Sequence, residues 1–164
     1  PEWSVSIGYV VDGEAVAGGI LNPSTDRRVV GAVGSGVTVN GTPSRVSDRA
    51  TLAGASVLAS RSEIGRGEWA RFEDLGVVPC GSVAWKMALV AAGDVDATWT
   101  LVPKNEWDVA AGTALVRAGG GAVFYPSGEP PRFNRSRTKL EGLVACSAVL
   151  EAEIRARLRI PENA

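Results

Sequence analysis

The chain has 164 residues, of which 45% are hydrophobic and 21% charged, so it is long enough for one domain with a sizeable core. Lys and Arg total 17 against 18 Asp and Glu, and this near balance predicts neither a nucleic-acid polymer nor a membrane as partner. The sequence contains no His, which excludes imidazole acid–base chemistry and His-ligated zinc from these residues. Catalysis by the chain must therefore use carboxylates, hydroxyls, lysines or a hard metal ion.

Two cysteines, Cys80 and Cys146, stand far apart in the sequence. Widely separated single cysteines are more typical of buried thiols in a reducing compartment than of a disulfide or a metal pair. No apolar run approaches the ~20 residues that a membrane-spanning helix needs. We therefore expect a cytoplasmic protein.

Residues 1–47 have the pattern of an antiparallel meander. Residues 3–11 are rich in β-forming side chains, and Asp12-Gly13 directly after them is a strong hairpin signal. Return strands are expected over residues 14–21, 27–33 and 37–39. Such a sheet cannot cover its own apolar face, so we expect a helical layer that these residues do not supply. The uncovered face predicts poor solubility or self-association of the chain alone.

Residues 48–164 alternate between strand and helix patterns, which indicates an α/β layer. Strands are expected over residues 56–60, 77–80, 97–99, 122–125 and 142–146, and helices over 67–75, 82–92, 106–118 and 147–158. Ser82 is the expected N-cap of the second of these helices, and the glycines at 119–121 end the third. The chain is therefore divided into a meander, residues 1–47, and an α/β unit, residues 48–164.

The start of the helix over residues 106–118 is the stretch that carries most information about chemistry. Glu106 and Asp108 place two acids in its first turn, where exposed amide groups favour negative side chains. Small residues at Ala110, Ala111 and Gly112 allow the helix to approach a neighbour closely. On composition alone, a capping role for Asp108 is more common than a metal site.

Several motifs in one order resemble the inositol monophosphatase family. They are residues 1–10, the Gly- and Pro-containing turns over 19–43, the segment 81–84, and Trp107–Gly112 followed by Gly119–Gly121. The resemblance covers nearly the whole chain. It implies an α/β fold of the layered αβαβα sandwich type, in which the C-terminal layer is complete and the N-terminal layer is reduced to its antiparallel meander.

The same resemblance implies a Mg²⁺-dependent phosphomonoesterase that acts on a small-molecule phosphate ester. Hard cations with oxygen ligands suit a chain without His. By position, Asp108 corresponds to a metal ligand of the family, and Gly81 and Ser82 correspond to residues beside the leaving group of the substrate. Family members are often homodimers, and we expect the same of the intact enzyme.

One departure from the family pattern is large. The other metal ligands, a Glu and an Asp-Pro-x-Asp-Gly-Thr motif, belong upstream of Pro1 and are absent from this sequence. The threonine that positions the nucleophilic water belongs there too, so the sequence identifies no catalytic residue within the chain. We therefore expect the 164-residue chain alone to be inactive or nearly so. A truncated, non-catalytic fragment is the alternative to an enzyme.

The residues leave two substrate classes open. Inositol-specific members carry a Glu at the position of Leu101, and Leu cannot accept hydrogen bonds from inositol hydroxyls. Residues 103–108 look more like the 3′(2′),5′-bisphosphate nucleotidase branch, in which Lys104 would pair with a second phosphate and Arg61 would meet a phosphate. Solvated surface charge is an equally good interpretation of either cation taken singly. A 3′(2′),5′-bisphosphate nucleotide is the leading expectation, and an inositol or sugar phosphate is the alternative.

Overall fold

The computed structural model describes residues 2–160, and residues 5–44 form a five-stranded antiparallel sheet. The strands follow one another in chain order: β1 (Val5–Val11), β2 (Glu14–Asn22), β3 (Arg27–Ala32), β4 (Gly36–Val39) and β5 (Thr42–Ser44). The β1–β2 hairpin turns at Asp12 and Gly13, whose φ angles of 49° and 79° are both positive, as a type I′ hairpin turn requires. The predicted meander is confirmed, with β5 as a strand that the sequence did not indicate.

The second sheet is mixed, in the order β10-β12-β8-β6-β7. Strand β6 runs parallel to β7 and β8, whereas β12 runs antiparallel to β8 and β10. A two-stranded pair, β9 with β11, lies beside the start of helix α3. The strands are β6 (Val57–Ala59), β7 (Val77–Pro79), β8 (Ala97–Thr100), β9 (Lys104–Asn105), β10 (Gly121–Phe124), β11 (Lys139–Leu140) and β12 (Leu143–Ser147).

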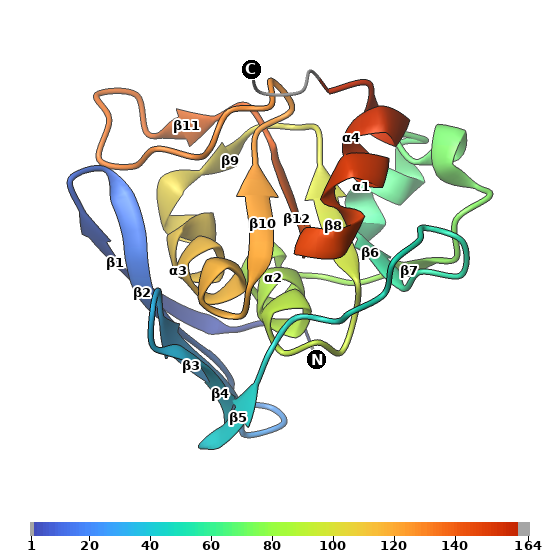
Figure 1. Cartoon of the computed structure of the whole chain (residues 1–164). Helices are drawn as coiled ribbons and strands as arrows, with labels where there is room; N and C mark the ends of the chain where they lie inside the picture. Colours follow the sequence, from blue (N-terminus) through green and yellow to red (C-terminus); the bar gives the residue numbers. More distant parts are fainter. Residues whose placement is uncertain (1, 161–164) are drawn as a thin grey trace.

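Helices form two of the four layers (Figure 1). Helices α2 (Val83–Ala91) and α3 (Glu106–Ala118) lie between the two sheets, and α1 (Arg61–Gly65) and α4 (Glu151–Leu158) cover the far face of the second sheet. Two apolar clusters of buried residues correspond to this division, one around α2 and α3 and the other beneath α4. The βαβα arrangement agrees with the predicted sandwich, in which a meander precedes a complete α/β layer.

The expected helix over residues 67–75 is wrong. This segment forms turns around a single 3₁₀ turn at Ala70–Phe72, and Gly67 has a positive φ of 76°. Its buried side chains, Trp69, Phe72 and Leu75, recur every three residues, which is the period of a 3₁₀ helix. Trp69 stacks on Trp99 with 4.8 Å between ring centroids, so aromatic packing onto the second sheet decides the local backbone.

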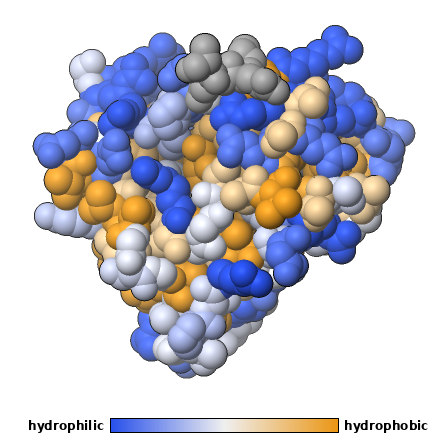
Figure 2. All heavy atoms as spheres, in the orientation of Figure 1, coloured by the Kyte–Doolittle hydropathy of each residue, from blue (hydrophilic) through white to orange (hydrophobic). Residues whose placement is uncertain are grey.

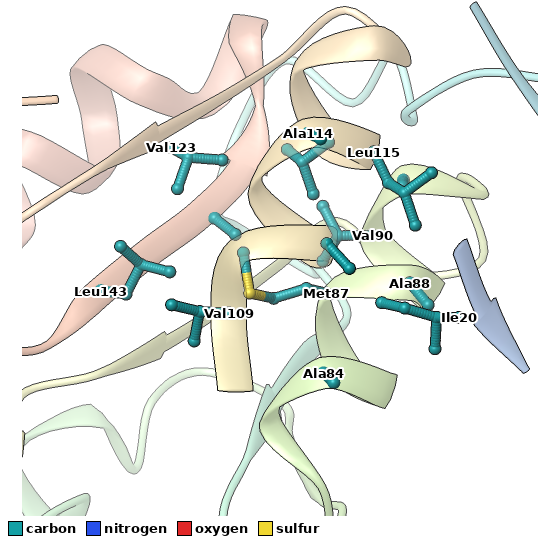
Figure 3. Packing of buried hydrophobic residues seen from close by; sticks show 14 of the residues in the cluster. Ile20, Ala84, Met87, Ala88, Val90, Val109, Ala114, Leu115, Val123 and Leu143 are labelled. Atoms are coloured by element: carbon teal, nitrogen blue, oxygen red, sulfur yellow. The ribbon is translucent and has the colours of Figure 1, made fainter. Parts of the chain in front are cut away.

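Small residues allow the central helices to pack closely. Figure 3 shows Met87 of α2 beside Val109 of α3. A Cβ atom added at Gly112 of α3 would lie 2.6 Å from Cβ of Met87, and one added at Gly18 of β2 would lie 2.6 Å from the carbonyl oxygen of Ala111. Both distances are shorter than side-chain carbons tolerate, so glycine is required where α3 meets α2 and the first sheet.

The outer face of the first sheet has no cover within residues 2–160. Val5, Ile7, Tyr9 and Val11 alternate along β1 and are all exposed, Ile7 by 71%. Figure 2 shows hydrophobic side chains over this edge of the molecule. The predicted lack of a helical layer is therefore right for this outer face and wrong for the inner face, which α2 and α3 cover.

Both cysteines are free and buried, as the sequence predicted. Burial raises the pKa of the Cys146 thiol to about 12, which keeps it protonated and unreactive. Among the described residues, no helix has both the length and the apolar character needed to cross a bilayer.

The close approach of β2 to α3 can be tested with two neighbouring glycines. We expect Gly18→Ala to lower the free energy of unfolding by about 1–3 kcal/mol, because the new methyl group meets the α3 backbone. Gly19→Ala is the matched control, since its Cβ would have Val30 as nearest neighbour at an ordinary 3.8 Å. Urea unfolding of both variants measures the difference. Equal stability of the two variants would contradict this account of the packing.

Candidate active site

A polar pocket opens where the starts of β1, α2 and α3 meet. Its volume is about 360 Å³. Four serines, two lysines and one carboxylate line it, which is a hydrophilic set for a pocket next to the main core. The lining residues are Ser4, Ser6, Ser60, Ser82, Val83, Ala84, Lys86, Lys104, Trp107 and Asp108.

Asp108 stands in the first turn of α3 and lines the pocket. Its Oδ2 accepts hydrogen bonds from the backbone amide of Asn105, at 3.3 Å, and from the Asn105 side-chain amide, at 3.2 Å. The carboxylate therefore has the capping role that composition favoured. Oδ1 accepts no hydrogen bond within residues 2–160, so one oxygen is available to a ligand in the pocket. Capping and cation binding are thus compatible at this side chain.

Ser82 is the N-cap of α2, as predicted, and its Oγ accepts a hydrogen bond from the backbone amide of Trp85 at 3.2 Å. The same Oγ lies 3.2 Å from Oγ of Ser4, so Ser82 joins the start of α2 to the start of the first sheet. The Gly81 amide donates to the Glu2 carboxylate at 2.5 Å. Gly81 is not among the residues that line the pocket, and its amide donor is engaged by Glu2.

Arg61 forms an ion pair with Glu2 at the protein surface and is not among the residues that line the pocket. The hydrogen bond from Arg61, followed by that from Gly81, lowers the pKa of the Glu2 carboxyl. The same ion pair raises the pKa of the Arg61 guanidinium. Leu101, the position that bears on inositol recognition, lines a different groove, beside Pro103 and Tyr125.

Lys104 faces a buried carboxylate. Its Nζ lies 3.1 Å from Oε1 of Glu63, which also accepts a 2.7 Å hydrogen bond from Oγ1 of Thr100. Burial raises the pKa of the Glu63 carboxyl, but the hydrogen bonds from Thr100 and Lys104 outweigh this effect and leave the pKa below its usual value. Glu63 is therefore an anion that balances the charge of Lys104. The sequence did not single out Glu63.

Lys86 is a second pocket lysine that the sequence analysis missed. It lies on α2, the residue is 3% exposed, and burial lowers the pKa of its ammonium group. Within residues 2–160 its Nζ has no hydrogen bond or ion pair. The available signal was a lysine inside the otherwise apolar run Val83–Ala91, where a charged side chain needs a reason to be buried.

The described residues contain no group of three or more Cys, Asp or Glu side chains placed to hold a metal ion. Asp108 alone offers an uncommitted carboxylate oxygen in the pocket. Mg²⁺ prefers oxygen ligands and keeps several waters, so one carboxylate suits it as a partial ligand set. The part of the chain that the structure describes thus fits one side of a cation site.

The electrostatics of Lys86 can be tested by stability against pH. The pKa of Lys86 is lower in the folded state than its unfolded value of ~10.4. At pH values between these two pKa values, the unfolded state therefore binds more protons than the folded state. Wild-type stability should therefore rise as pH increases from the lowered pKa towards ~10.4. We expect Lys86→Met to stabilise the protein by roughly 1 kcal/mol or more at pH 7, and this gain to shrink as pH rises.

Thermal unfolding of both proteins over a pH series measures the gain from Lys86→Met. The titratable groups around Lys86 are Glu63, Cys80, Lys104 and Glu2, and they are the same in both proteins. The exposed Lys139→Met is the control and should change stability by less than ~0.5 kcal/mol. Destabilisation by Lys86→Met at every pH would show that Lys86 has a partner that stabilises its charge.

The chain matches the model of the Inositol monophosphatase family over residues 1–161. An inositol-1-monophosphatase of Mesorhizobium japonicum is 35% identical over 161 residues, covering 93% of this chain and 60% of that protein. A fructose-1,6-bisphosphatase/inositol-1-monophosphatase of Thermotoga maritima is 34% identical over 153 residues, covering 88% of this chain and 57% of that protein.

Solved structures share the fold. The inositol monophosphatase of Anabaena superposes with a TM-score of 0.79 at 29% identity, covering 96% of this chain and 64% of that one. The chain thus spans less than two thirds of the length of these relatives. Because the family model matches almost every residue and the layers superpose, this chain belongs to the inositol monophosphatase family.

Proposed function

We propose that the protein containing this chain is a Mg²⁺-dependent phosphomonoesterase, with its substrate phosphate bound in the pocket beside Asp108. The uncommitted Oδ1 of Asp108 in a pocket lined by hydroxyls and lysines is the observation that carries the proposal. Carboxylates bind hard cations, and serine hydroxyls and lysines donate hydrogen bonds to phosphate oxygens. Membership of the family and relatives named inositol-1-monophosphatase support the same reaction class.

In this proposal Asp108 supplies one metal ligand, and the others come from outside residues 2–160. When bound, Mg²⁺ would supply Lewis-acid activation of the phosphate and of water. By its position in the family motif, Ser82 would lie on the leaving-group side, and it lines the pocket where α2 meets the start of β1. We further propose a cytoplasmic homodimer.

A 3′(2′),5′-bisphosphate nucleotide is the substrate class that we propose first. Two lysines line the pocket, and a substrate with two phosphates carries more negative charge than one with a single phosphate. An inositol or sugar monophosphate is the second candidate, supported by the printed names of the relatives. At position 101, where inositol-specific members of the family carry a Glu, Leu has no side-chain acceptor for inositol hydroxyls, which supports the first class.

Asp108→Asn in the product of the complete natural reading frame tests the metal role. We expect kcat/KM for phosphomonoester hydrolysis to fall by at least ~100-fold, because the amide removes a charged ligand while retaining the shape of the side chain. Phosphate release is the measurement, with Mg²⁺ titrated for each variant. The exposed Asp48→Asn is the control and should retain full activity. Unchanged activity of the Asp108 variant would defeat the assignment.

The 164-residue chain by itself provides a separate test. Its described residues offer one cation ligand in the pocket, so we expect no Mg²⁺-dependent phosphate release above the buffer rate. The assay uses inositol 1-phosphate and adenosine 3′,5′-bisphosphate with Mg²⁺ in excess. Clear turnover would show that the described residues suffice for catalysis. Absence of turnover in the complete reading frame as well would favour the non-catalytic alternative.

A further inference from the structure

Lys86 differs from the other cations near the pocket because no carboxylate neutralises it. Lys104 is paired with Glu63, and Arg61 is paired with Glu2 on the surface. The carboxylate that acts most strongly on Lys86 through space is Glu63, which Thr100 and Lys104 already bind. Among the described residues, Lys86 is therefore the pocket cation with charge left to offer a ligand.

The position of Lys86 makes this unpaired charge costly. The residue is only 3% exposed, and it belongs to the helix that packs between the two sheets. An ammonium group in a buried position without a partner destabilises the folded state, and an apolar residue at the same place would remove this cost, so a lysine here is explained by a binding role. Because Lys86 lines the polar pocket, an anion bound there can reach it and offset the cost.

The pocket supplies neutral donors beside this charge. Ser6 Oγ is buried and has no hydrogen-bond partner within residues 2–160, and it lines the same pocket. Ser60 and Ser82 add further hydroxyls to the wall. A buried cation combined with hydroxyl donors is complementary to a phosphate group, whose oxygens accept several hydrogen bonds.

We propose that Lys86 determines specificity by binding a second phosphate of the substrate, the one that is not hydrolysed. This inference rests on the proposed function, which places the reacting phosphate at Asp108. The second phosphate would belong to a nucleoside bisphosphate or to a sugar bisphosphate, since the same cation suits both. Lys104 contributes less to this contact, because Glu63 already balances its charge.

The test compares bisphosphates with monophosphates. Isothermal titration of the complete reading-frame product, with Ca²⁺ replacing Mg²⁺ and again in EDTA, measures affinity without relying on turnover. The ligand pairs are adenosine 3′,5′-bisphosphate with adenosine 3′-monophosphate, and fructose 1,6-bisphosphate with fructose 1-phosphate, so that each monophosphate keeps the reacting phosphate and lacks the second one. We expect Lys86→Met to weaken the bisphosphate of one pair by about 10- to 100-fold and its monophosphate by less than about 3-fold. The affected pair identifies the substrate source.

Controls separate binding from folding. Lys139→Met removes an exposed lysine outside the pocket and should leave every affinity unchanged. Lys86→Gln is the second variant, for use if Lys86→Met does not yield a cooperative thermal transition. Equal losses for bisphosphate and monophosphate, no loss, or no binding of either bisphosphate by the wild type would overturn the inference.

Failure of this inference and failure of the proposed function give different results. Hydrolysis that depends on Asp108, with unchanged preference for bisphosphates in Lys86→Met, would defeat the inference and leave the function standing. Loss of bisphosphate affinity in Lys86→Met, in a protein that hydrolyses no phosphomonoester, would defeat the function and leave the anion site standing.

Discussion

The packing of α2 against α3 between two sheets is the constraint on which the site depends. Gly112 meets Met87, and Gly18 meets the backbone of Ala111, at distances that leave no room for a side-chain carbon. Because interiors are close-packed, a larger residue there would displace α3. The first turn of α3 carries Asp108 and the start of α2 carries Ser82, so this packing brings both into one pocket.

Charge is distributed unevenly around this pocket. Glu63 is buried beneath Lys104 and holds it, whereas Lys86 extends from α2 without a partner in the described residues. A buried ion pair contributes little net stability, but removing one partner is costly, so Glu63 and Lys104 act as a unit. Lys86 has the opposite character, since its charge destabilises the folded state until an anion arrives. A polar site that costs stability is typical of regions retained for binding.

The outer face of the first sheet poses a different physical problem. Its apolar residues along β1 are exposed, while the inner face is filled by α3. Exposed apolar surface of this kind favours association or cover by another segment. Ser4 and Ser6 alternate with these apolar residues along the chain, so the pocket lies on the opposite side of the strand from the exposed face.

Local sequence determined most of the fold. Several features act through short-range backbone chemistry and could be predicted from the sequence alone. They are the Asp12-Gly13 turn, the alternation of the meander, the Ser82 cap and the glycines after α3. The family motifs also marked Asp108. Tertiary structure decided the rest: stacking of Trp69 on Trp99 replaced an expected helix with a 3₁₀ turn. Tertiary structure also paired Arg61 and Lys104 with carboxylates and left Lys86 buried without one. These ion pairs join residues that are far apart in the sequence, and no local sequence pattern shows which distant residues come together.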